Sequence, residues 1–195
     1  MPVISVSPVL TLKLRTSNIR LMGLGKPAGG YGNFFEDFHV GQEFQHSLGR
    51  TILEADNTWF TLLTMNTHPA HFDAHYASRT EFGKILVNSG LTVAIILGIS
   101  VADVSQNAIA NLGWSDIKLS HPVFIGDTLY AESRVTPVRP SKSRPNTGIV
   151  SVHTSGINQD GDVCVSWERT AMIAGRNSEQ AAWEHPRPKV ATSDQ

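Results

Sequence analysis

The chain contains an uncharged run of 18 residues, from Ile85 to Ala102, within its 195 residues. A run of this length is long enough to cross a bilayer as a helix. However, no aromatic belt flanks it, and small or polar residues crowd its start and interrupt its second half: Asn88, Ser89, Gly90, Thr92, Gly98 and Ser100. We therefore expect a helix buried in the core of a soluble domain, against which the other segments pack.

The hydrophobic pattern changes towards the C-terminus. Apolar residues follow a helical period between residues 54 and 105, but they alternate with polar residues after residue 114. Three strands with short connections are predicted in this second part, at residues 129–135, 149–157 and 163–173. Short connections indicate an antiparallel sheet, to which residues 44–48 contribute an earlier strand. Helices inserted between that strand and the later ones predict an α+β fold.

The folded body is predicted to be a single domain of residues 31–176, with a polar tail at residues 177–195. Residues 1–30 form a leader that holds basic residues but no Asp or Glu. This composition is typical of a mitochondrial transit peptide, although a flexible leader or a start codon placed too early explains it equally well. We expect the protein in the cytoplasm, or in the mitochondrial matrix if the leader is a transit peptide.

The charge balance excludes partners that bind mainly through bulk charge. The chain has 16 basic and 17 acidic residues, which gives a formal net charge of −1. Such a chain has no general attraction for nucleic acid or for an anionic membrane, so we expect neither as a partner. The lone cysteine, Cys164, excludes an internal disulfide and a multi-cysteine zinc site.

The residues that carry chemistry lie in two neighbouring segments. In the first, Pro69 interrupts the helical pattern just before His71, whose imidazole ring can take up and release a proton. Asp73 is placed to cap a short helix at residues 74–81, which Gly83 ends. A histidine beside a proline also serves as a turn or capping residue. Three histidines within eight residues raise a metal site as another alternative, but the one carboxylate among them suits capping, so we expect no metal.

The second segment is the start of the uncharged helix. Asn88 or Ser89 caps this helix, as any buried helix requires. The amides of the first turn lack partners within the helix and carry the positive end of its dipole, so they can bind an oxyanion. His71 and these amides would together handle a proton and a developing enolate.

Three motifs in the same order resemble the MaoC-like family of hydratases and dehydratases. The first is Phe34-Phe-Glu-Asp-Phe-x-x-Gly41, near the start of the predicted domain. The second is His71-Phe-Asp-Ala-His-Tyr-Ala77, followed by Thr80-Glu-Phe-Gly-Lys84 and a small polar step into the apolar helix. The third is His121-Pro-Val-Phe-Ile-Gly-Asp-Thr-Leu129. Together the motifs span most of residues 34–135.

This resemblance implies a hot-dog fold, in which a curved antiparallel sheet wraps a long central helix and two such units pair as a homodimer. It implies an acyl-CoA or acyl carrier protein thioester as substrate, as in the (R)-specific enoyl-CoA hydratases, and no separate cofactor. By position, it assigns catalytic roles to Asn66, His71 and the amide of Ser89. Asn88 and Gly90, on either side of Ser89, are the substrate-binding residues that it implies.

Asn66 departs from the family pattern, which has an Asp at this position. A carboxamide orients a water molecule, but it cannot accept a proton near pH 7. Either His71 alone takes the proton, or a carboxylate on the substrate takes part. Asn66 and residues 111–114 look closest to the branch that handles branched C5 dicarboxyl esters of the itaconyl-, mesaconyl- or methylmalyl-CoA type.

The sequence therefore predicts a hydro-lyase that hydrates a 2-enoyl-CoA thioester and dehydrates the corresponding 3-hydroxyacyl-CoA. A catalytically silent acyl-CoA-binding protein of the same fold is one alternative, which the replacement of the Asp by Asn66 favours. A hot-dog thioesterase is another, in which water attacks the carbonyl carbon instead of C3.

Overall fold

The computed structural model describes residues 32–179. The predicted leader and residues 180–195 of the predicted tail lie outside the described residues. Short elements and helices come first along the chain, and four long strands follow. In order, the elements are η1 (Phe35–Asp37), β1 (Glu43–Gln45), β2 (Arg50–Thr51), α1 (Glu54–Leu63), η2 (Pro69–His71), α2 (Ala74–Ala77), α3 (Ser89–Ser100), the π turn η3 (Val101–Ser105), β3 (Ala108–Leu119), β4 (Thr128–Pro140), β5 (Thr147–Ile157) and β6 (Val163–Ala174).

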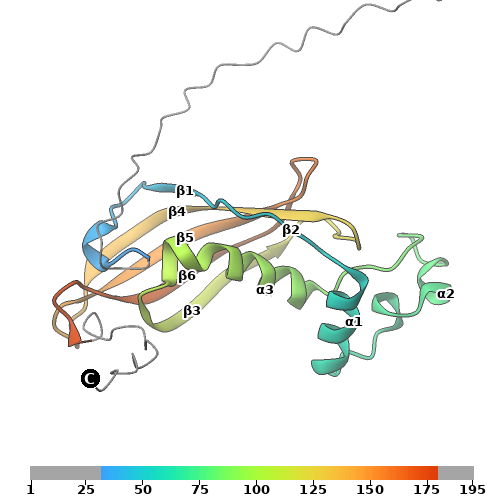
Figure 1. Cartoon of the computed structure of the whole chain (residues 1–195), viewed down its shortest axis with the longest axis horizontal. Helices are drawn as coiled ribbons and strands as arrows, with labels where there is room; N and C mark the ends of the chain where they lie inside the picture. Colours follow the sequence, from blue (N-terminus) through green and yellow to red (C-terminus); the bar gives the residue numbers. More distant parts are fainter. Residues whose placement is uncertain (1–31, 180–195) are drawn as a thin grey trace, which may run out of the picture. The chain divides into compact units, whose positions relative to one another are not determined.

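The strands form an antiparallel sheet, and α3 lies along one of its faces (Figure 1). The strand order is β1-β4-β5-β6-β3, and β2 also pairs with β4. β4, β5 and β6 are the three consecutive strands expected from the alternating pattern, and each is longer than predicted. The prediction of an α+β hot-dog fold in a single domain is confirmed, because a long helix rests against a curved antiparallel sheet.

Helix α3 is the long apolar helix that the uncharged run predicted, but it uses only part of that run and buries only the face turned to the sheet. Residues 85–88 are extended, and Leu86 bridges Phe124. The helix begins at Ser89 because the side chain of Asn88 caps it by accepting a hydrogen bond from the amide of Gly90. Its inner face completes the main core with residues of the sheet and of the entry segment: Ile52, Val87, Leu91, Ile96, Ile99, Val123, Leu129, Ala131, Cys164, Val165 and Trp167.

Strand β3 was not recognised in the sequence. Its pairing with β6 shifts register at Ala108/Ala110, Asn111/Gly113 and Ser115/Lys118. Each shift breaks the two-residue alternation of side chains, so the period expected of a strand cannot be read there. β3 pairs with β6 along one side, is at the end of the strand order, and carries exposed residues along most of its length.

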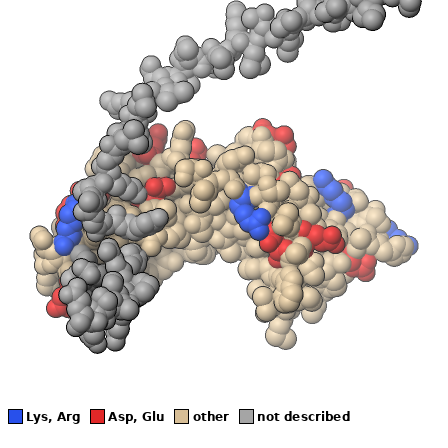
Figure 2. Space-filling view, in the orientation of Figure 1, with Lys and Arg blue, Asp and Glu red and all other residues tan. Residues whose placement is uncertain are grey.

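Within residues 32–179, no helix is both long and apolar enough to cross a membrane. The charged side chains on the face shown in Figure 2 form small groups of both signs over several elements. On that face there is no continuous basic surface of the kind that binds nucleic acid.

Gly156 on β5 allows α3 to approach the sheet closely. A Cβ atom at this position would lie 2.5 Å from Cγ1 of Ile96 and 2.8 Å from Cγ1 of Val165. We expect Gly156→Ala to lower the free energy of unfolding by about 1–3 kcal/mol, because the added methyl group overpacks the core. Chemical denaturation at equilibrium measures this change.

Gly98→Ala is the matched control, because a Cβ atom at Gly98 on α3 meets no heavy atom within 4 Å. That substitution should raise stability by about 0.5–1 kcal/mol, since alanine is the better helix former. If both substitutions stabilised the protein, the close approach of α3 to β5 would be wrong.

Candidate active site

His71 is the last residue of η2, the turn that follows α1. Pro69 occupies the first position of this turn, where its missing amide hydrogen costs nothing. The ring of His68 accepts a hydrogen bond from the amide of Ala70 and so caps the turn. The predicted break in the helical pattern at Pro69 is therefore confirmed, and it places His71 beside the chain that enters α3.

The imidazole of His71 is anchored by one hydrogen bond to that entry segment. Its Nδ1 atom lies 2.9 Å from the carbonyl oxygen of Leu86. Because a carbonyl only accepts, Nδ1 carries the hydrogen, and the neutral ring then has its lone pair on Nε2. Nε2 has no hydrogen-bond partner among the described residues, so it is available to take a proton from a water molecule.

Asn57 on α1 connects the turn of His71 to the entry of α3. Its side chain is fully buried. Nδ2 donates to the carbonyl oxygen of His71 at 2.8 Å and lies 3.5 Å from that of Leu86, while Oδ1 accepts from the amide of Asn88 at 2.8 Å. One side-chain amide thus satisfies backbone groups of both segments that were predicted to carry the chemistry.

Thr61, one turn further along α1, makes the second connection. Its hydroxyl oxygen accepts from Nδ2 of Asn88 at 3.3 Å, and its carbonyl oxygen accepts from the amide of Asn66 at 3.0 Å. The Oδ1 atom of Asn66 accepts from the amide of His68 at 3.0 Å. Asn66 therefore stays next to the turn of His71, and its Nδ2 atom has no hydrogen-bond partner among the described residues.

The first turn of α3 leaves one backbone amide free. Gly90 donates to the side chain of Asn88, while Leu91 and Thr92 donate to the carbonyl oxygen of Asn88. The amide of Ser89 has no acceptor among the described residues. It points out from the positive end of the helix dipole, which favours an oxyanion at this position.

A pocket of about 260 Å³, which we call the Ser89 pocket, opens beside this free amide. Its walls come from the segment before α3, from the first turn of α3, and from the end of β3 with the residues that follow it. Leu86, whose carbonyl oxygen holds His71, is one of the lining residues. His71 is not a lining residue itself, but its ring is bonded to Leu86, which shares the wall of this pocket with Ser89.

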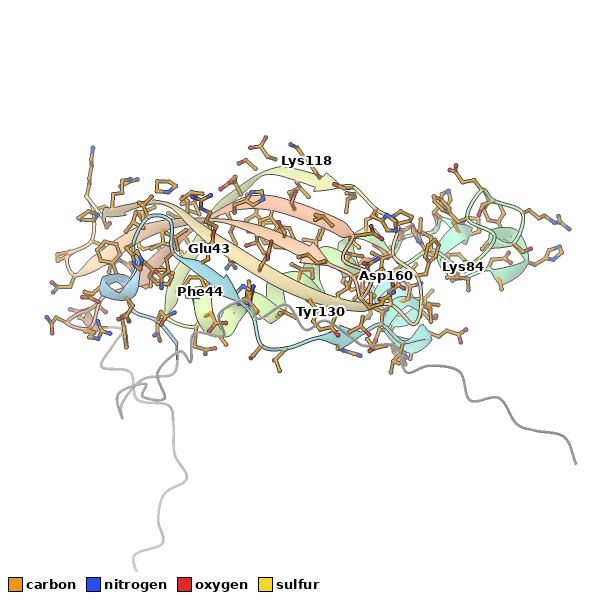
Figure 3. The ribbon with its side chains drawn as sticks, turned by 90° about the horizontal axis from the view of Figure 1, so that it is seen from above. Glu43, Phe44, Lys84, Lys118, Tyr130 and Asp160 are labelled. Carbon is orange, nitrogen blue, oxygen red and sulfur yellow. The ribbon has the colours of Figure 1, made fainter. Side chains whose placement is uncertain are left out.

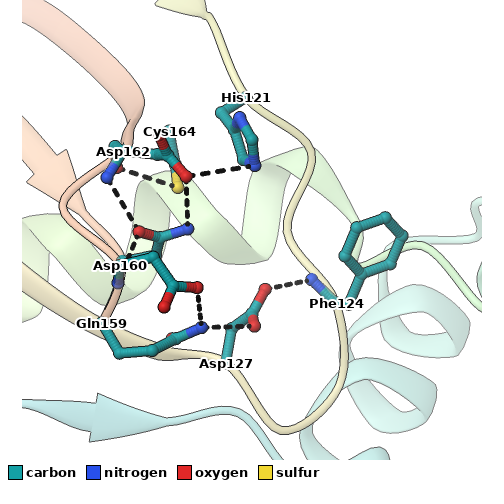
Figure 4. A network of polar contacts seen from close by, with 8 residues as sticks. His121, Phe124, Asp127, Gln159, Asp160, Asp162 and Cys164 are labelled. Carbon is teal, nitrogen blue, oxygen red and sulfur yellow. Dashed lines mark hydrogen bonds and ion pairs between the residues drawn. The ribbon is translucent and has the colours of Figure 1, made fainter.

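The far wall of the Ser89 pocket is held by polar contacts between two connections of the sheet (Figure 4). Asp127 accepts from the amide of Phe124 at 2.8 Å and from the side chain of Gln159 at 3.1 Å. His121, which lines the pocket, lies 3.7 Å from Asp162. These contacts join the β3–β4 and β5–β6 connections and keep the wall in place.

Cys164 also lines the Ser89 pocket, but its thiol is not a nucleophile there. Burial raises the pKa of Cys164 to about 11, and the negative charge of Asp127 adds to the effect. The thiol is therefore neutral at pH 7, whereas nucleophilic cysteines need a lowered pKa.

The structure brings four of the five predicted site residues to the start of α3. His71, Asn88, Ser89 and Gly90 lie there, although the amide of Gly90 is already bonded to Asn88. Asn66 is linked to them through Thr61 and has no hydrogen bond to His71. Asp73 caps α2 as predicted, but α2 ends at Ala77 instead of residue 81.

Sequence reasoning missed Asn57 and Thr61. Helix α1 follows the apolar period expected of it, yet that face is exposed: Trp59, Leu62 and Leu63 have exposed fractions of 68%, 63% and 76%. The buried face carries the two polar residues instead, four positions apart. That spacing on one helix face was the signal available in the sequence.

Among residues 32–179, no three His, Cys, Asp or Glu side chains come together as a metal site would need.

Lys84 lies after α2, with its ammonium group 4.0 Å from the centre of the Phe124 ring. Figure 3 shows Lys118 on β3 and Lys84 near α2, well apart from each other. The two lysines therefore do not form one basic cluster.

The sequence matches the profile of a family described as mesaconyl-CoA hydratase over residues 27–191. The chain belongs to this family. It is 35% identical over 162 residues to beta-methylmalyl-CoA dehydratase from Chloroflexus aurantiacus, an alignment that covers 83% of this chain and 46% of that protein. The predicted membership of the MaoC-like hydratases and dehydratases is therefore confirmed.

Solved structures agree with the family and the fold. A MaoC domain protein dehydratase from Chloroflexus aurantiacus aligns with a TM-score of 0.73 and 33% identity, over 87% of this chain and 46% of that one. A protein from Mycobacterium tuberculosis with a double hot-dog fold aligns with a TM-score of 0.69 at 22% identity, over 80% of this chain and 47% of that one. The chain thus spans about half the length of these relatives.

The hydrogen bonds of Asn57 generate a prediction about this family member. Asn57→Ala leaves the amide of Asn88 and the carbonyl oxygen of His71 buried without partners. We expect it to lower the free energy of unfolding by about 3 kcal/mol, because each unsatisfied group costs about 1–3 kcal/mol. Denaturant unfolding measures the loss.

Thr58→Ala on the same helix is the matched control, since no hydrogen bond of the Thr58 side chain would be lost. Asn57→Asp separates donation from acceptance, because a carboxylate still accepts from Asn88 but repels the two carbonyl oxygens. A stability of Asn57→Ala equal to that of the control would show that Asn57 does not hold the site together.

Proposed function

We propose that this protein catalyses the reversible addition of water to a 2-enoyl-CoA thioester. The observation that carries the proposal is the hydrogen bond from Nδ1 of His71 to the carbonyl oxygen of Leu86. It leaves a basic nitrogen on Nε2, on a residue tied to the wall of the Ser89 pocket. Conjugate addition of water requires a base and an oxyanion-binding amide, and Nε2 of His71 and the amide of Ser89 are the free groups that can fill these two roles.

In the forward direction, Nε2 of His71 takes a proton from water while the water oxygen forms a bond to C3 of the substrate. The electron pair of the C2=C3 double bond moves towards the thioester, and negative charge develops on its oxygen. The amide of Ser89 stabilises this charge, which is larger in the transition state than in the substrate. The imidazolium then returns a proton to C2, so no net proton is consumed. Dehydration is the same path in reverse.

Asn66 orients the water molecule in this scheme. Its Oδ1 atom is engaged by the amide of His68, but its Nδ2 group is free to donate to a water oxygen. A carboxamide supplies no base, so His71 carries the whole proton transfer.

The substrate class that we propose is a branched C5 dicarboxyl-CoA ester. The names of the family and of a relative support it: the matching family is described as mesaconyl-CoA hydratase, and the Chloroflexus relative is a beta-methylmalyl-CoA dehydratase.

We also propose that two copies pair through the free edge of β3. This strand is 12 residues long and exposes Leu112, Trp114, Ile117 and Leu119. A long edge strand with exposed apolar side chains invites pairing with another chain. The relative with a double hot-dog fold is about twice the length of the region that it shares with this chain, so a second unit of this fold is a fitting occupant.

His71→Ala tests the catalytic base. We expect kcat/KM for enoyl-CoA hydration to fall by about 10²–10⁴-fold, which is the usual contribution of a general base. Loss of absorbance of the conjugated thioester measures the rate, and release of free thiol in the same samples reports any hydrolysis.

His75→Ala is the matched control, because His75 is an exposed histidine on α2 whose side chain has no hydrogen bond in the structure. Full hydration by His71→Ala would exclude the proposed role. Thiol release by the wild-type protein without hydration would favour a thioesterase. Thermal stabilisation by enoyl-CoA without turnover of any substrate would favour a silent binding protein.

Asn66→Asp tests the role of the carboxamide. Aspartate can keep the hydrogen bond from the amide of His68 and supplies a second base near His71. We expect kcat to be preserved, or raised by up to about 100-fold. A hundredfold loss of kcat with unchanged binding of acyl-CoA would mean that the amide group itself is chemically required.

A further inference from the structure

Arg169 on β6 is a buried cation with no anionic partner among residues 32–179. It is 2% exposed, and neither its Nε nor its Nη2 atom has a hydrogen-bond partner among the described residues. Burial lowers the pKa of Arg169 to about 10, so the guanidinium still carries its charge at pH 7. A buried charge without an anion is one of the most unfavourable arrangements in a folded protein. This position therefore indicates that an anion comes from outside the described chain.

Arg169 lines a hollow between the C-terminal half of α3 and the start of β3, which we call the Arg169 pocket. Its volume is about 280 Å³, and its other lining residues include Leu97, Val101, Ser105 and Asn111. None of the lining residues is acidic. Ser105 and Asn111 add neutral hydrogen-bonding groups beside the guanidinium. A guanidinium with free N–H groups matches the two oxygens of a carboxylate.

Within one chain, the Arg169 pocket is too far from Ser89 for one small substrate to reach both. Leu97 and Val101 follow Ser89 on the α3–η3 segment by about 12 Å and 18 Å, respectively, at 1.5 Å per helical residue. A five-carbon acyl group held at the Ser89 amide does not span that distance. The Arg169 pocket of the same chain therefore does not serve its own Ser89 pocket.

Pairing of two copies through β3 changes this distance. An antiparallel pairing of β3 with its own copy requires a two-fold axis perpendicular to the sheet. Since β3 spans Ala108–Leu119, the axis of a full pairing crosses near its middle. Residues 108–111 of one copy then lie opposite residues 116–119 of the other, and both α3 helices stay on the same face of the joined sheet.

This symmetry places the two kinds of pocket side by side. Residues 108–111 line the Arg169 pocket, and Leu119 lines the Ser89 pocket. Each Ser89 pocket therefore lies next to the Arg169 pocket of the other copy. Neighbouring strands are about 4.8 Å apart, and Arg169 lies on β6, two strand spacings from β3 of the other copy. The distance across the edge is therefore roughly 10 Å. A long arginine side chain and the acyl group of the substrate can span it together.

We propose that the partner subunit's Arg169 binds the second carboxylate of a dicarboxyl acyl-CoA substrate whose thioester lies at His71 and Ser89. This inference rests on the proposed hydratase function and adds the residue that selects the substrate class. A substrate without the second carboxylate leaves the guanidinium unpaired. The site therefore discriminates against it, as sites with buried polar groups do.

Arg169→Met tests this assignment, with mesaconyl-CoA and crotonyl-CoA as the dicarboxyl and monocarboxyl thioesters. We expect kcat/KM for mesaconyl-CoA to fall by about 100-fold or more, and kcat/KM for crotonyl-CoA to stay the same or rise. The melting temperature should be equal or higher, because the variant removes an unpaired buried charge. Arg134→Met is the control, because Arg134 is an exposed arginine of β4. It should change kcat/KM for neither mesaconyl-CoA nor crotonyl-CoA.

Equal losses on both thioesters together with a lower melting temperature would show that Arg169 is structural and would overturn the proposal. An unchanged preference for mesaconyl-CoA in Arg169→Met would overturn it as well, while leaving the hydratase function intact. If the wild-type protein hydrated neither thioester, the proposed function would fail and this inference with it.

Mixed dimers test whether the arginine crosses to the other copy. A dimer of one His71→Ala chain and one Arg169→Met chain holds one complete site only if His71 and Arg169 come from different chains. Random mixing should then restore about a quarter of the wild-type mesaconyl-CoA activity. No gain over the separate variants would overturn the proposal that the partner subunit supplies Arg169.

Discussion

The buried side chain of Asn57 is the interaction on which the arrangement of the site depends. A buried amide must satisfy its donors and its acceptor, and Asn57 does so with backbone groups from two segments. The hydrogen bond from His71 to Leu86 and the one from the Leu86 amide to Ala70 also join these segments. The turn that carries His71 and the entry of α3 are therefore held in one relative position. The carbonyl oxygen of Thr61 accepts from the amide of Asn66 and so fixes Asn66 to the same helix. Helix α1 is thus a polar support for the site, and its apolar side faces outward.

At the start of α3, one residue caps the helix and another keeps a free amide. Asn88 accepts from the amides of Gly90, Leu91 and Thr92, so the helix is capped without help from a ligand. The amide of Ser89 remains without an acceptor among the described residues, and Ser89 lines a pocket whose wall includes Leu86, to which His71 is bonded. In the proposed mechanism, capping and oxyanion binding therefore use different donors, and the oxyanion-binding amide is free before the substrate arrives.

Several unsatisfied features of the described chain lie near β3, apart from the exposed apolar face of α1. This strand has a free edge, its apolar side chains are exposed, and Arg169 on the neighbouring strand has no anion. Trp114 on β3 stacks on Trp167, whose ring nitrogen is also buried without a partner. In the dimer that we propose, a second unit along this edge would cover the apolar side chains, and the carboxylate of the proposed substrate would pair with the cation. The two proposals thus concern the same edge of the sheet.

The sequence by itself determined the buried helix, the meander of β4, β5 and β6, the turn at Pro69 and the cap at Asp73, because each follows from local periodicity or from backbone chemistry. It also pointed to His71 and to the start of α3, through motifs that are local in the chain. The bulged strand β3 was not predicted, because its register shifts interrupt the alternation of polar and apolar residues that indicates a strand. Only the tertiary structure decided that Asn57 and Thr61 face inward, which nitrogen of His71 is free, and that Arg169 is buried without an anion. These properties depend on contacts between residues far apart in the chain, and no local pattern encodes them.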